Sequence, residues 1–123
     1  MKKLIALTLA LALALTLCAC GHGKYQKEIT ALVTEQAELL LQSTQSGSAL
    51  TEELTALGIQ DVEDVDGIRV FEMYYTGLFD GGVEYGFYYA PQDTALDKTM
   101  TAQDHMVIEP ITGHWYYYEW HNG

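Results

Sequence analysis

One stretch of the chain, Ile68 to Tyr89, has the pattern of two β-strands folded back on each other. β-Branched and aromatic residues, which strands favour, dominate the two arms Ile68–Thr76 and Val83–Tyr89. Between the arms, the segment Phe79-Asp80-Gly81-Gly82 contains two glycines, which supply the positive φ angles of a tight turn. The pattern predicts an antiparallel hairpin, and we expect the rest of the domain to be organised around it.

The length of the turn decides which side chains of the hairpin share a face. A two-residue loop at Asp80-Gly81 would pair odd positions with even ones and leave both faces mixed. A three-residue loop, with Gly82 left-handed, pairs odd with odd and makes one face wholly apolar. We prefer this register, which buries Phe71, Met73, Tyr75, Tyr85, Phe87 and Tyr89. The open face then carries Val70, Glu72, Tyr74, Glu84, Gly86 and Tyr88.

Two helices are predicted before the hairpin. From Tyr25 to about Ser43, apolar residues recur at spacings of three and four, which is the pattern of one long amphipathic helix. A polar break follows, and a second, short helix is predicted from Glu52 to Leu57. Thr51 is placed to cap the start of this short helix, and Gly58 is placed to end it.

An acidic segment, Asp61 to Gly67, leads into the first strand and is similar in composition to a calcium-binding loop. Such a loop needs a glycine at its sixth position and carboxylates at its first and twelfth positions. With Gly67 at the sixth position, Val62 and Met73 occupy the places of these carboxylates. The segment is therefore interpreted as a solvated acidic turn, and no metal ligand is assigned to it.

Two more strands are predicted after the hairpin, at His105–Glu109 and Trp115–Trp120, joined by a turn at residues 110–113. Pro91 should end the preceding strand, because proline has no backbone N–H to donate. Residues 92–104 then form a polar loop, either an edge flap or a crossover. The wholly aromatic face of the last strand is placed inward (Tyr116, Tyr118, Trp120), and the face with a charge is placed outward (Trp115, Tyr117, Glu119).

The predicted fold is α+β, with one long N-terminal helix packed on a four-stranded antiparallel sheet. This layout is similar to that of cystatin-like folds, a likeness of topology that implies no function. The chain has no internal repeat and is short, so residues 25–123 are expected to form a single domain.

The start of the chain has the features of a secretory signal. Two lysines precede an uncharged run from Leu4 to Leu17. As a helix this run would reach about 21 Å, short of a hydrocarbon core of about 30 Å, so a permanent transmembrane span is the weaker interpretation.

The segment that follows, Leu17-Cys18-Ala19-Cys20, resembles the lipobox of bacterial lipoproteins. The resemblance implies a diacylglyceryl group on Cys20, with residues 1–19 removed as the signal peptide and residues 20–24 acting as a tether. The alternative is an ordinary secretory signal with incidental cysteines. Two aromatic segments, Gly86–Asp93 and His114–His121, are also similar to segments of small lipoproteins of Gram-positive bacteria whose role is unknown. This second resemblance implies a protein anchored to the cell membrane on its extracytoplasmic face.

The charge of the chain argues against some partners. Loss of residues 1–19 would leave four basic side chains against seventeen acidic ones, a formal charge of −13. Nucleic acid is therefore not expected as a partner, and anionic lipid headgroups should repel the domain. Cys20 would be the only remaining cysteine, with its sulfur blocked by lipid, which leaves no disulfide or cysteine metal site. The histidines lack the spacing of a zinc site, so no metal and no cofactor is assigned.

Carboxylates and aromatic rings are predicted to lie together on the open face of the sheet. The candidate binding surface comprises Glu72, Tyr74, Glu84, Tyr88, Trp115, Tyr117 and Glu119. Exposed aromatic surfaces often mark interaction sites, so we expect a non-catalytic module that binds a protein or a cell-envelope glycan. One alternative is a small cell-wall glycan hydrolase that uses Glu72 and Glu84 as its two carboxylates. Another is that the aromatic pairs only stabilise the sheet.

Overall fold

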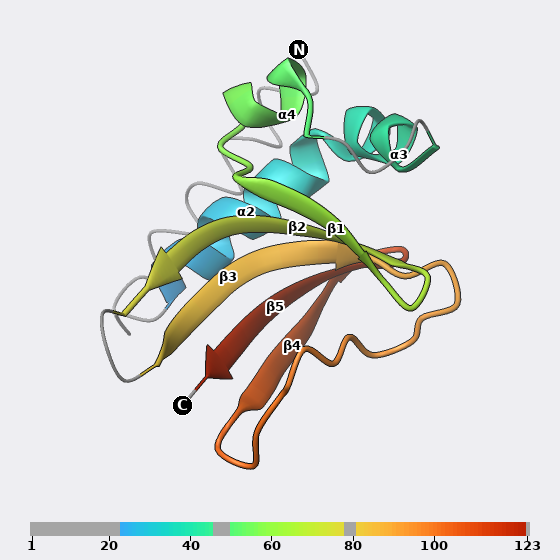
Figure 1. The fold of residues 1–123 in the computed structure, drawn as a ribbon. Helices are drawn as coiled ribbons and strands as arrows, with labels where there is room; N and C mark the ends of the chain where they lie inside the picture. Colours follow the sequence, from blue (N-terminus) through green and yellow to red (C-terminus); the bar gives the residue numbers. More distant parts are fainter. Residues whose placement is uncertain (1–22, 46–49, 78–80, 123) are drawn as a thin grey trace.

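The computed structural model of the protein describes residues 23–45, 50–77 and 81–122. It shows an α+β fold in which helices lie on one face of a five-stranded antiparallel sheet (Figure 1). The strands are ordered β1-β2-β3-β5-β4. The elements are α2 (Gly23–Glu35), α3 (Ala37–Gln45), α4 (Glu52–Ala56), β1 (Asp61–Val65), β2 (Ile68–Thr76), β3 (Gly82–Tyr89), β4 (His105–Thr112) and β5 (Trp115–Asn122).

The α+β class is confirmed, whereas the predicted four strands and single long helix are wrong. The predicted signal segment, Cys20 and most of the tether lie outside the described residues. Within the described ranges, no helix is both long enough and apolar enough to cross a membrane.

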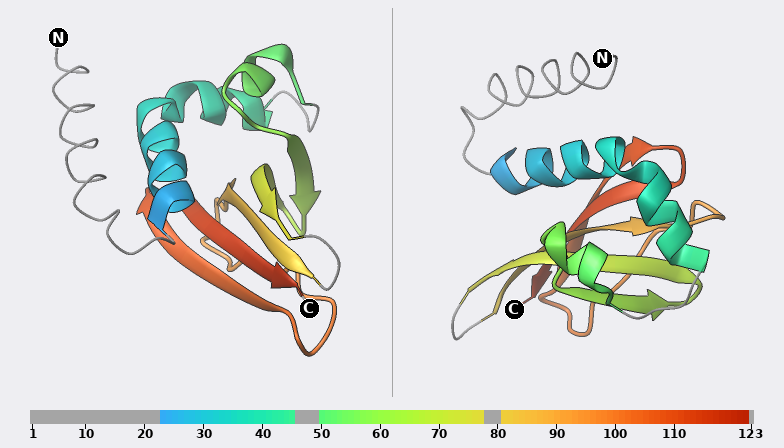
Figure 2. Two further views of the ribbon diagram at one scale, coloured as in Figure 1. Left: turned by 90° about the vertical axis from the view of Figure 1, so that its left-hand side faces the viewer. Right: turned by 90° about the horizontal axis from the view of Figure 1, so that it is seen from above.

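The predicted long helix is divided at Gln36 into α2 and α3, which run in different directions (Figure 2). The backbone hydrogen bonds continue through the bend: Gln36 N donates to Leu32 O at 2.8 Å, and Leu40 N donates to Gln36 O at 3.0 Å. The apolar stripe therefore stays against the sheet, with Ile29, Val33 and Leu40 fully buried.

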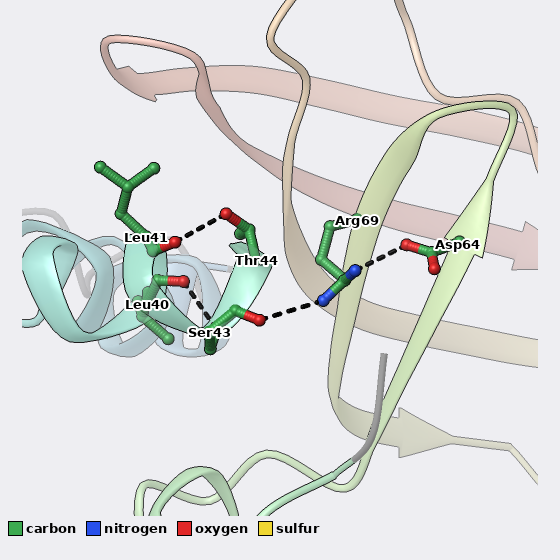
Figure 3. Close-up of polar contacts among 6 residues, drawn as sticks. All are labelled: Leu40, Leu41, Ser43, Thr44, Asp64 and Arg69. Carbon is green, nitrogen blue, oxygen red and sulfur yellow. Dashed lines mark hydrogen bonds and ion pairs between the residues drawn. The ribbon is translucent and has the colours of Figure 1, made fainter. Parts of the chain in front are cut away.

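An arginine attaches the C-terminal end of α3 to the sheet (Figure 3). Arg69, in β2, donates from Nη1 to the carbonyl oxygen of Ser43 at 3.2 Å and from Nε to Asp64 Oδ1 at 2.6 Å. The last carbonyl groups of a helix have no partner within the helix, and Arg69 supplies a donor to one of them. The short helix α4 begins as predicted, because Thr51 Oγ1 accepts a hydrogen bond from Leu54 N at 3.2 Å.

The acidic segment before the hairpin is not a simple turn. Its first part is strand β1, which pairs with β2 at one edge of the sheet. Val65 pairs with Ile68, so only Asp66 and Gly67 form the connection, with φ values of 50° and 85°. Positive φ at both residues is the geometry of a type I′ hairpin turn, which favours the pair Asp-Gly. The strand adds Val62 to the core and presents acidic side chains along the edge.

In the central hairpin, odd residues pair with odd residues, as predicted, only in the half that is farther from the hairpin loop. There Phe71 pairs with Phe87. The register shifts at a β-bulge at Met73, after which Tyr74 pairs with Tyr85. A bulge sets two residues of one strand against one residue of its partner, so two consecutive side chains can reach the same face. Met73 and Tyr74 accordingly both contact the core beneath the helices.

The loop of this hairpin is longer than the predicted three residues. Thr76 pairs with Val83, which leaves six residues between the paired positions. Gly82 lies in β3 and is not left-handed, whereas Gly81 has φ of 97°. Residues 78–80 lie outside the described part of the chain.

Strand β4 is longer than predicted, and the turn after it is shorter. The strand continues through Pro110 to Thr112, and the turn consists of Gly113 and His114, so the predicted turn at residues 110–113 is wrong. Pro110 is tolerated because β4 is an edge strand, which pairs with a neighbour on one side only. A proline whose backbone nitrogen faces the open side of such a strand removes no hydrogen bond of the sheet.

Both faces of the sheet are covered, by different means. The helix-side face packs against α2, α3 and α4 and buries Val62, Phe71, Met73, Phe87, Trp115 and Tyr117. The strap-side face is covered by residues 91–104, here called the strap, which run from β3 to β4 across the side away from the helices (Figure 1). It buries Ile68, Val70, Tyr88, Ala90, Leu96 and Tyr118. The predicted polar loop is thus a crossover, since β5 lies between β3 and β4.

Both faces of β5 contain buried side chains, so the predicted division into an inward and an outward face is wrong. Tyr117 pairs with Phe87 and is fully buried on the helix side, whereas Tyr118 is fully buried under the strap. The charge that decided the prediction belongs to Glu119, which pairs with Tyr85 near the start of β3. There it accepts a hydrogen bond from Tyr117, so its charge does not mean that this face of the strand is exposed.

Candidate functional site

The seven residues predicted to form one open surface are divided between the two faces. Tyr74, Trp115, Tyr117 and Glu119 lie on the helix side, whereas Glu72, Glu84 and Tyr88 lie on the strap side. Three of them are aromatic residues that are buried: Tyr117 is 0% exposed, Tyr88 1% and Trp115 5%. The prediction that these seven residues share one open face is therefore wrong. The bulge at Met73 turns Tyr74 to the helix side, and the strap covers Tyr88.

The structure instead brings tyrosines and carboxylates together on the helix side, around the first turns of α2. We define the tyrosine surface as Tyr25, Glu28, Tyr74, Tyr85, Glu119 and His121. The ring of Tyr25 lies between two others, with centroid distances of 4.5 Å to Tyr74 and 4.6 Å to Tyr85. All three rings keep partial contact with solvent. An aromatic group that is only half covered by its own protein can still offer a ring face or edge to a ligand.

Each carboxylate of the tyrosine surface is held by a tyrosine hydroxyl. Tyr74 donates to Glu28 Oε2 at 2.7 Å, and burial together with this bond raises the pKa of Tyr74 to about 12. Tyr117 donates to Glu119 Oε2, and burial followed by this bond raises the pKa of Tyr117 well above its usual range. Both hydroxyls therefore remain protonated donors at neutral pH.

A pair of histidines extends the tyrosine surface toward β4. His121 Nε2 lies 2.8 Å from Glu119 Oε1, which fixes the orientation of the imidazole. Its ring stacks on that of His105, the residue directly opposite in β4, at 4.4 Å and 13°. Among the described residues, no group of three or more histidine, cysteine or acidic side chains is arranged to hold a metal ion.

Sequence reasoning missed Tyr25 and Glu28 and treated Tyr85 as core. A signal was present, because Tyr25 and Glu28 are three residues apart on a predicted helix and so project from the same side. Their approach to Tyr74 depends on the bulge in β2, which no pattern of alternating residues indicates.

The strap side contains a second polar group of residues, which we call the lysine cluster: Lys98, Glu63, Glu72, Glu84, Tyr118 and Trp120. Glu84 is only 6% exposed, and it accepts hydrogen bonds from Lys98 Nζ and, at 2.7 Å, from the Tyr118 hydroxyl. Lys98 Nζ also lies 2.6 Å from Glu63 Oε1. The ammonium is thus held between carboxylates from β1 and β3.

Burial and charge shift the pKa values in the lysine cluster. Burial and the nearby charge of Glu84 raise the pKa of Glu72 above its usual value, while Lys98 acts in the opposite direction. Burial acts to lower the pKa of Lys98, but the bonds from Glu63 and Glu84 outweigh it and the net shift is upward. Lys98 therefore stays charged at neutral pH. Burial and Glu84 also raise the pKa of Tyr118 well above its usual range.

Gly86 makes room for the ring that crosses toward Glu84. A Cβ at this position would lie 2.8 Å from Cε1 of Tyr118 and 2.1 Å from the carbonyl oxygen of Phe71. Only glycine fits where a backbone and an aromatic ring approach so closely.

The pair of carboxylates considered for hydrolysis, Glu72 and Glu84, does lie on one face. However, Glu84 is covered by the strap and its Oε2 is already bonded to Lys98 and Tyr118. A glycosidase needs both carboxylates free to flank a sugar bond. In this arrangement of the strap, Glu84 is not available for that role.

The sequence and the fold were compared with known proteins. No family model, no curated protein and no solved structure matches the chain, so the candidate site rests on its own geometry.

Proposed function

We propose that this protein is a lipoprotein anchored on the extracytoplasmic face of the cell membrane, whose domain binds a protein or a cell-envelope glycan without catalysing a reaction. The anchor is supported by the lipobox-like Leu17-Cys18-Ala19-Cys20. The binding role is supported by one observation: the tyrosine surface combines partly exposed tyrosines with carboxylates that are already oriented.

The chemistry of the tyrosine surface suits a polyhydroxylated ligand. The rings of Tyr25, Tyr74 and Tyr85 offer apolar edges and faces against which C–H groups of a sugar can pack. The oxygens of Glu28 and Glu119 can accept hydrogen bonds from hydroxyl groups. Because tyrosine hydroxyls and His121 hold these carboxylates in place, little side-chain freedom is lost when a ligand binds.

A chemical-shift titration of the protein lacking residues 1–20 with peptidoglycan fragments and envelope extracts tests this role. Tyr25→Ala should weaken binding by about tenfold or more, because a central aromatic contact is lost. Tyr75→Ala is the matched control, since Tyr75 is 51% exposed and lies outside the tyrosine surface. Equal loss of binding in both variants, or binding that neither alters, would argue against the tyrosine surface as the site.

The anchor has its own test, in which the two neighbouring cysteines serve as variant and control. Cys20→Ser should abolish incorporation of labelled fatty acid and move the protein from the membrane fraction to the medium, whereas Cys18→Ser should change neither. Full membrane association of the Cys20→Ser protein, with label still incorporated, contradicts the lipobox assignment.

The alternative function, a cell-wall glycan hydrolase, has one observation in its favour: the raised pKa of Glu72 beside Glu84. A proton donor with a raised pKa next to an ionised carboxylate is the pairing that glycosidases use. Release of soluble fragments from labelled peptidoglycan by the wild-type protein, but not by Glu72→Gln, would favour this alternative over the binding role.

A further inference from the structure

The ammonium group of Lys98 sits in surroundings that resemble a ligand site. Carboxylates of Glu63 and Glu84 bond it directly, and Glu72 contributes a third negative charge nearby. Its Nζ also lies 5.0 Å from the centre of the Trp120 ring and 5.7 Å from that of Tyr118. Carboxylates combined with aromatic faces are the groups by which proteins recognise ammonium ligands.

The acceptor side of this site is built into the sheet. Glu63 comes from β1, Glu84 from β3, and Tyr118 and Trp120 from β5. Glu84 is nine-tenths buried and is oriented by the Tyr118 hydroxyl independently of Lys98. The three carboxylates exceed the single ammonium in charge, so removal of the ammonium would leave the buried carboxylate of Glu84 without a positive partner.

The strap that supplies Lys98 is held less firmly than the strands. Between residues 93 and 100, only Leu96 is buried and only Lys98 is half-buried, while the other side chains are exposed. Asp97 and Asp104 accept hydrogen bonds from Thr99, Met100 and Thr101 within the strap. Two side-chain bonds from β5 reach the ends of the strap: the Tyr116 hydroxyl donates to Asp93 at 2.7 Å, and Trp120 Nε1 donates to Asp104 at 3.4 Å. A segment with few buried contacts and no ladder of backbone bonds opens at a lower free energy than the sheet beneath it.

We propose that the strap-side face carries a binding site for a primary alkylammonium group, and that Lys98 occupies this site in cis as an internal blocking ligand. Release of the strap frees the site for an ammonium group in trans, such as a lysine side chain of another protein. Only molecules with an open strap can bind such a ligand. The apparent affinity is therefore the intrinsic affinity multiplied by the fraction of molecules in which the strap is open.

Chemical rescue tests the proposal. In Lys98→Ala the side chain is shortened by the three carbons and the nitrogen of n-propylammonium, so this small cation should refill the site. The full-length variant is expected to melt about 10 °C or more below the wild type. About 100 mM n-propylammonium should restore several degrees of this loss and shift the indole N–H resonance of Trp120.

Three controls distinguish a site from a general effect of cations on an acidic protein. The wild type and Lys98→Met, in which the site is filled, should gain little from n-propylammonium. 1-Propanol, which lacks the charge, and tetramethylammonium, which cannot donate hydrogen bonds, should not rescue Lys98→Ala. Adding Glu84→Gln to Lys98→Ala should abolish the rescue, since the main acceptor is lost.

Equal stabilisation of Lys98→Ala and Lys98→Met by n-propylammonium, or equal rescue by 1-propanol, overturns the proposal, because the effect would then not depend on a vacant ammonium site. Where Lys98→Ala does not fold in buffer alone, refolding by n-propylammonium and not by 1-propanol is the supporting result, measured by near-ultraviolet circular dichroism. Refolding by neither compound, while Lys98→Met is folded, overturns the proposal as well.

Discussion

The two faces of this sheet are buried by different means. On the helix side, the rings of Phe71 and Phe87 stack at 4.7 Å and 8°, and α2 adds Ile29 and Val33 above them. On the strap side, a segment without regular structure covers the aromatic rings through one leucine, Leu96, one buried ion pair, and hydrogen bonds of Asp93 and Asp104 to β5. A helix satisfies its own backbone groups, so its cover depends mainly on apolar contacts. The strap lacks that support, so its cover depends on a few anchoring side chains.

The largest effect is expected for residues beneath the helices. Phe87→Ala should lower the free energy of unfolding by about 3–5 kcal/mol, because a fully buried ring in contact with Phe71 and Trp115 is lost. Urea denaturation measures this loss. The neighbouring Tyr88→Ala, under the strap, should cost about 3 kcal/mol. A cost below about 1 kcal/mol for Tyr88→Ala would show that the strap does not bury this face.

The strap can be tested through its own apolar anchor. Leu96 is 1% exposed, so Leu96→Ala should lower the free energy of unfolding by about 2–3 kcal/mol, at the lower end for a buried leucine because the strap can collapse into the space. Met100, in the same strap, is 82% exposed, and Met100→Ala should stay within about 0.5 kcal/mol of the wild type. If the two variants were equally stable, Leu96 would not anchor the strap.

A smaller effect is expected from the ion pair. Glu84→Gln leaves the ammonium of Lys98 with Glu63 as its remaining direct partner and should cost about 2 kcal/mol. Combining Glu84→Gln with Lys98→Met removes both charges and should be less destabilising than the sum of the single variants by about 1 kcal/mol or more. Additive losses in this double-mutant cycle would mean that the two charges do not interact in the folded state.

The smallest expected effect depends on pH. The pKa of Glu72 is raised from 4.5 in the folded protein, mainly by burial, so its ionised form opposes folding at neutral pH. Glu72→Gln should therefore raise the free energy of unfolding at pH 7, by less than about 1 kcal/mol because the side chain keeps much of its contact with water. The gain should shrink as the pH falls through the raised pKa and vanish below 4.5, where the carboxyl is protonated in both states. A gain that grows toward acid would contradict the assigned direction.

Local signals predicted much of the secondary structure. The limits of β2 and the N-cap Thr51 agree with the prediction, because alternation and capping are properties of neighbouring residues. The prediction lacks strand β1 although Asp66-Gly67 is a strong hairpin signal, because the acidity of the segment favours a solvated turn. A charged edge strand needs only one buried side chain, here Val62.

The site was harder to predict than the elements. The bulge at Met73 reverses the alternation in the second half of β2, and nothing in the residue types marks it. Leu96 and Lys98 lie in a polar segment, and a lone leucine and lysine do not indicate that the segment covers a sheet. Face assignments that depended on strict alternation and on an uncovered second face were therefore wrong for Tyr74 and Tyr88.

The two edges of the sheet matter most if the protein is confined to a surface. The proposed anchor would hold many copies in one plane, where lateral encounters between exposed strand edges are frequent. Strand β1 presents the exposed carboxylate of Asp61 beside the ion-paired Glu63 and Asp64, and a charged edge of this kind disfavours pairing with the same edge of another copy. Strand β4 carries Pro110, which cannot donate to an added strand. If the proposed anchor is present, dense layers of the protein should therefore remain free of sheet-to-sheet polymers.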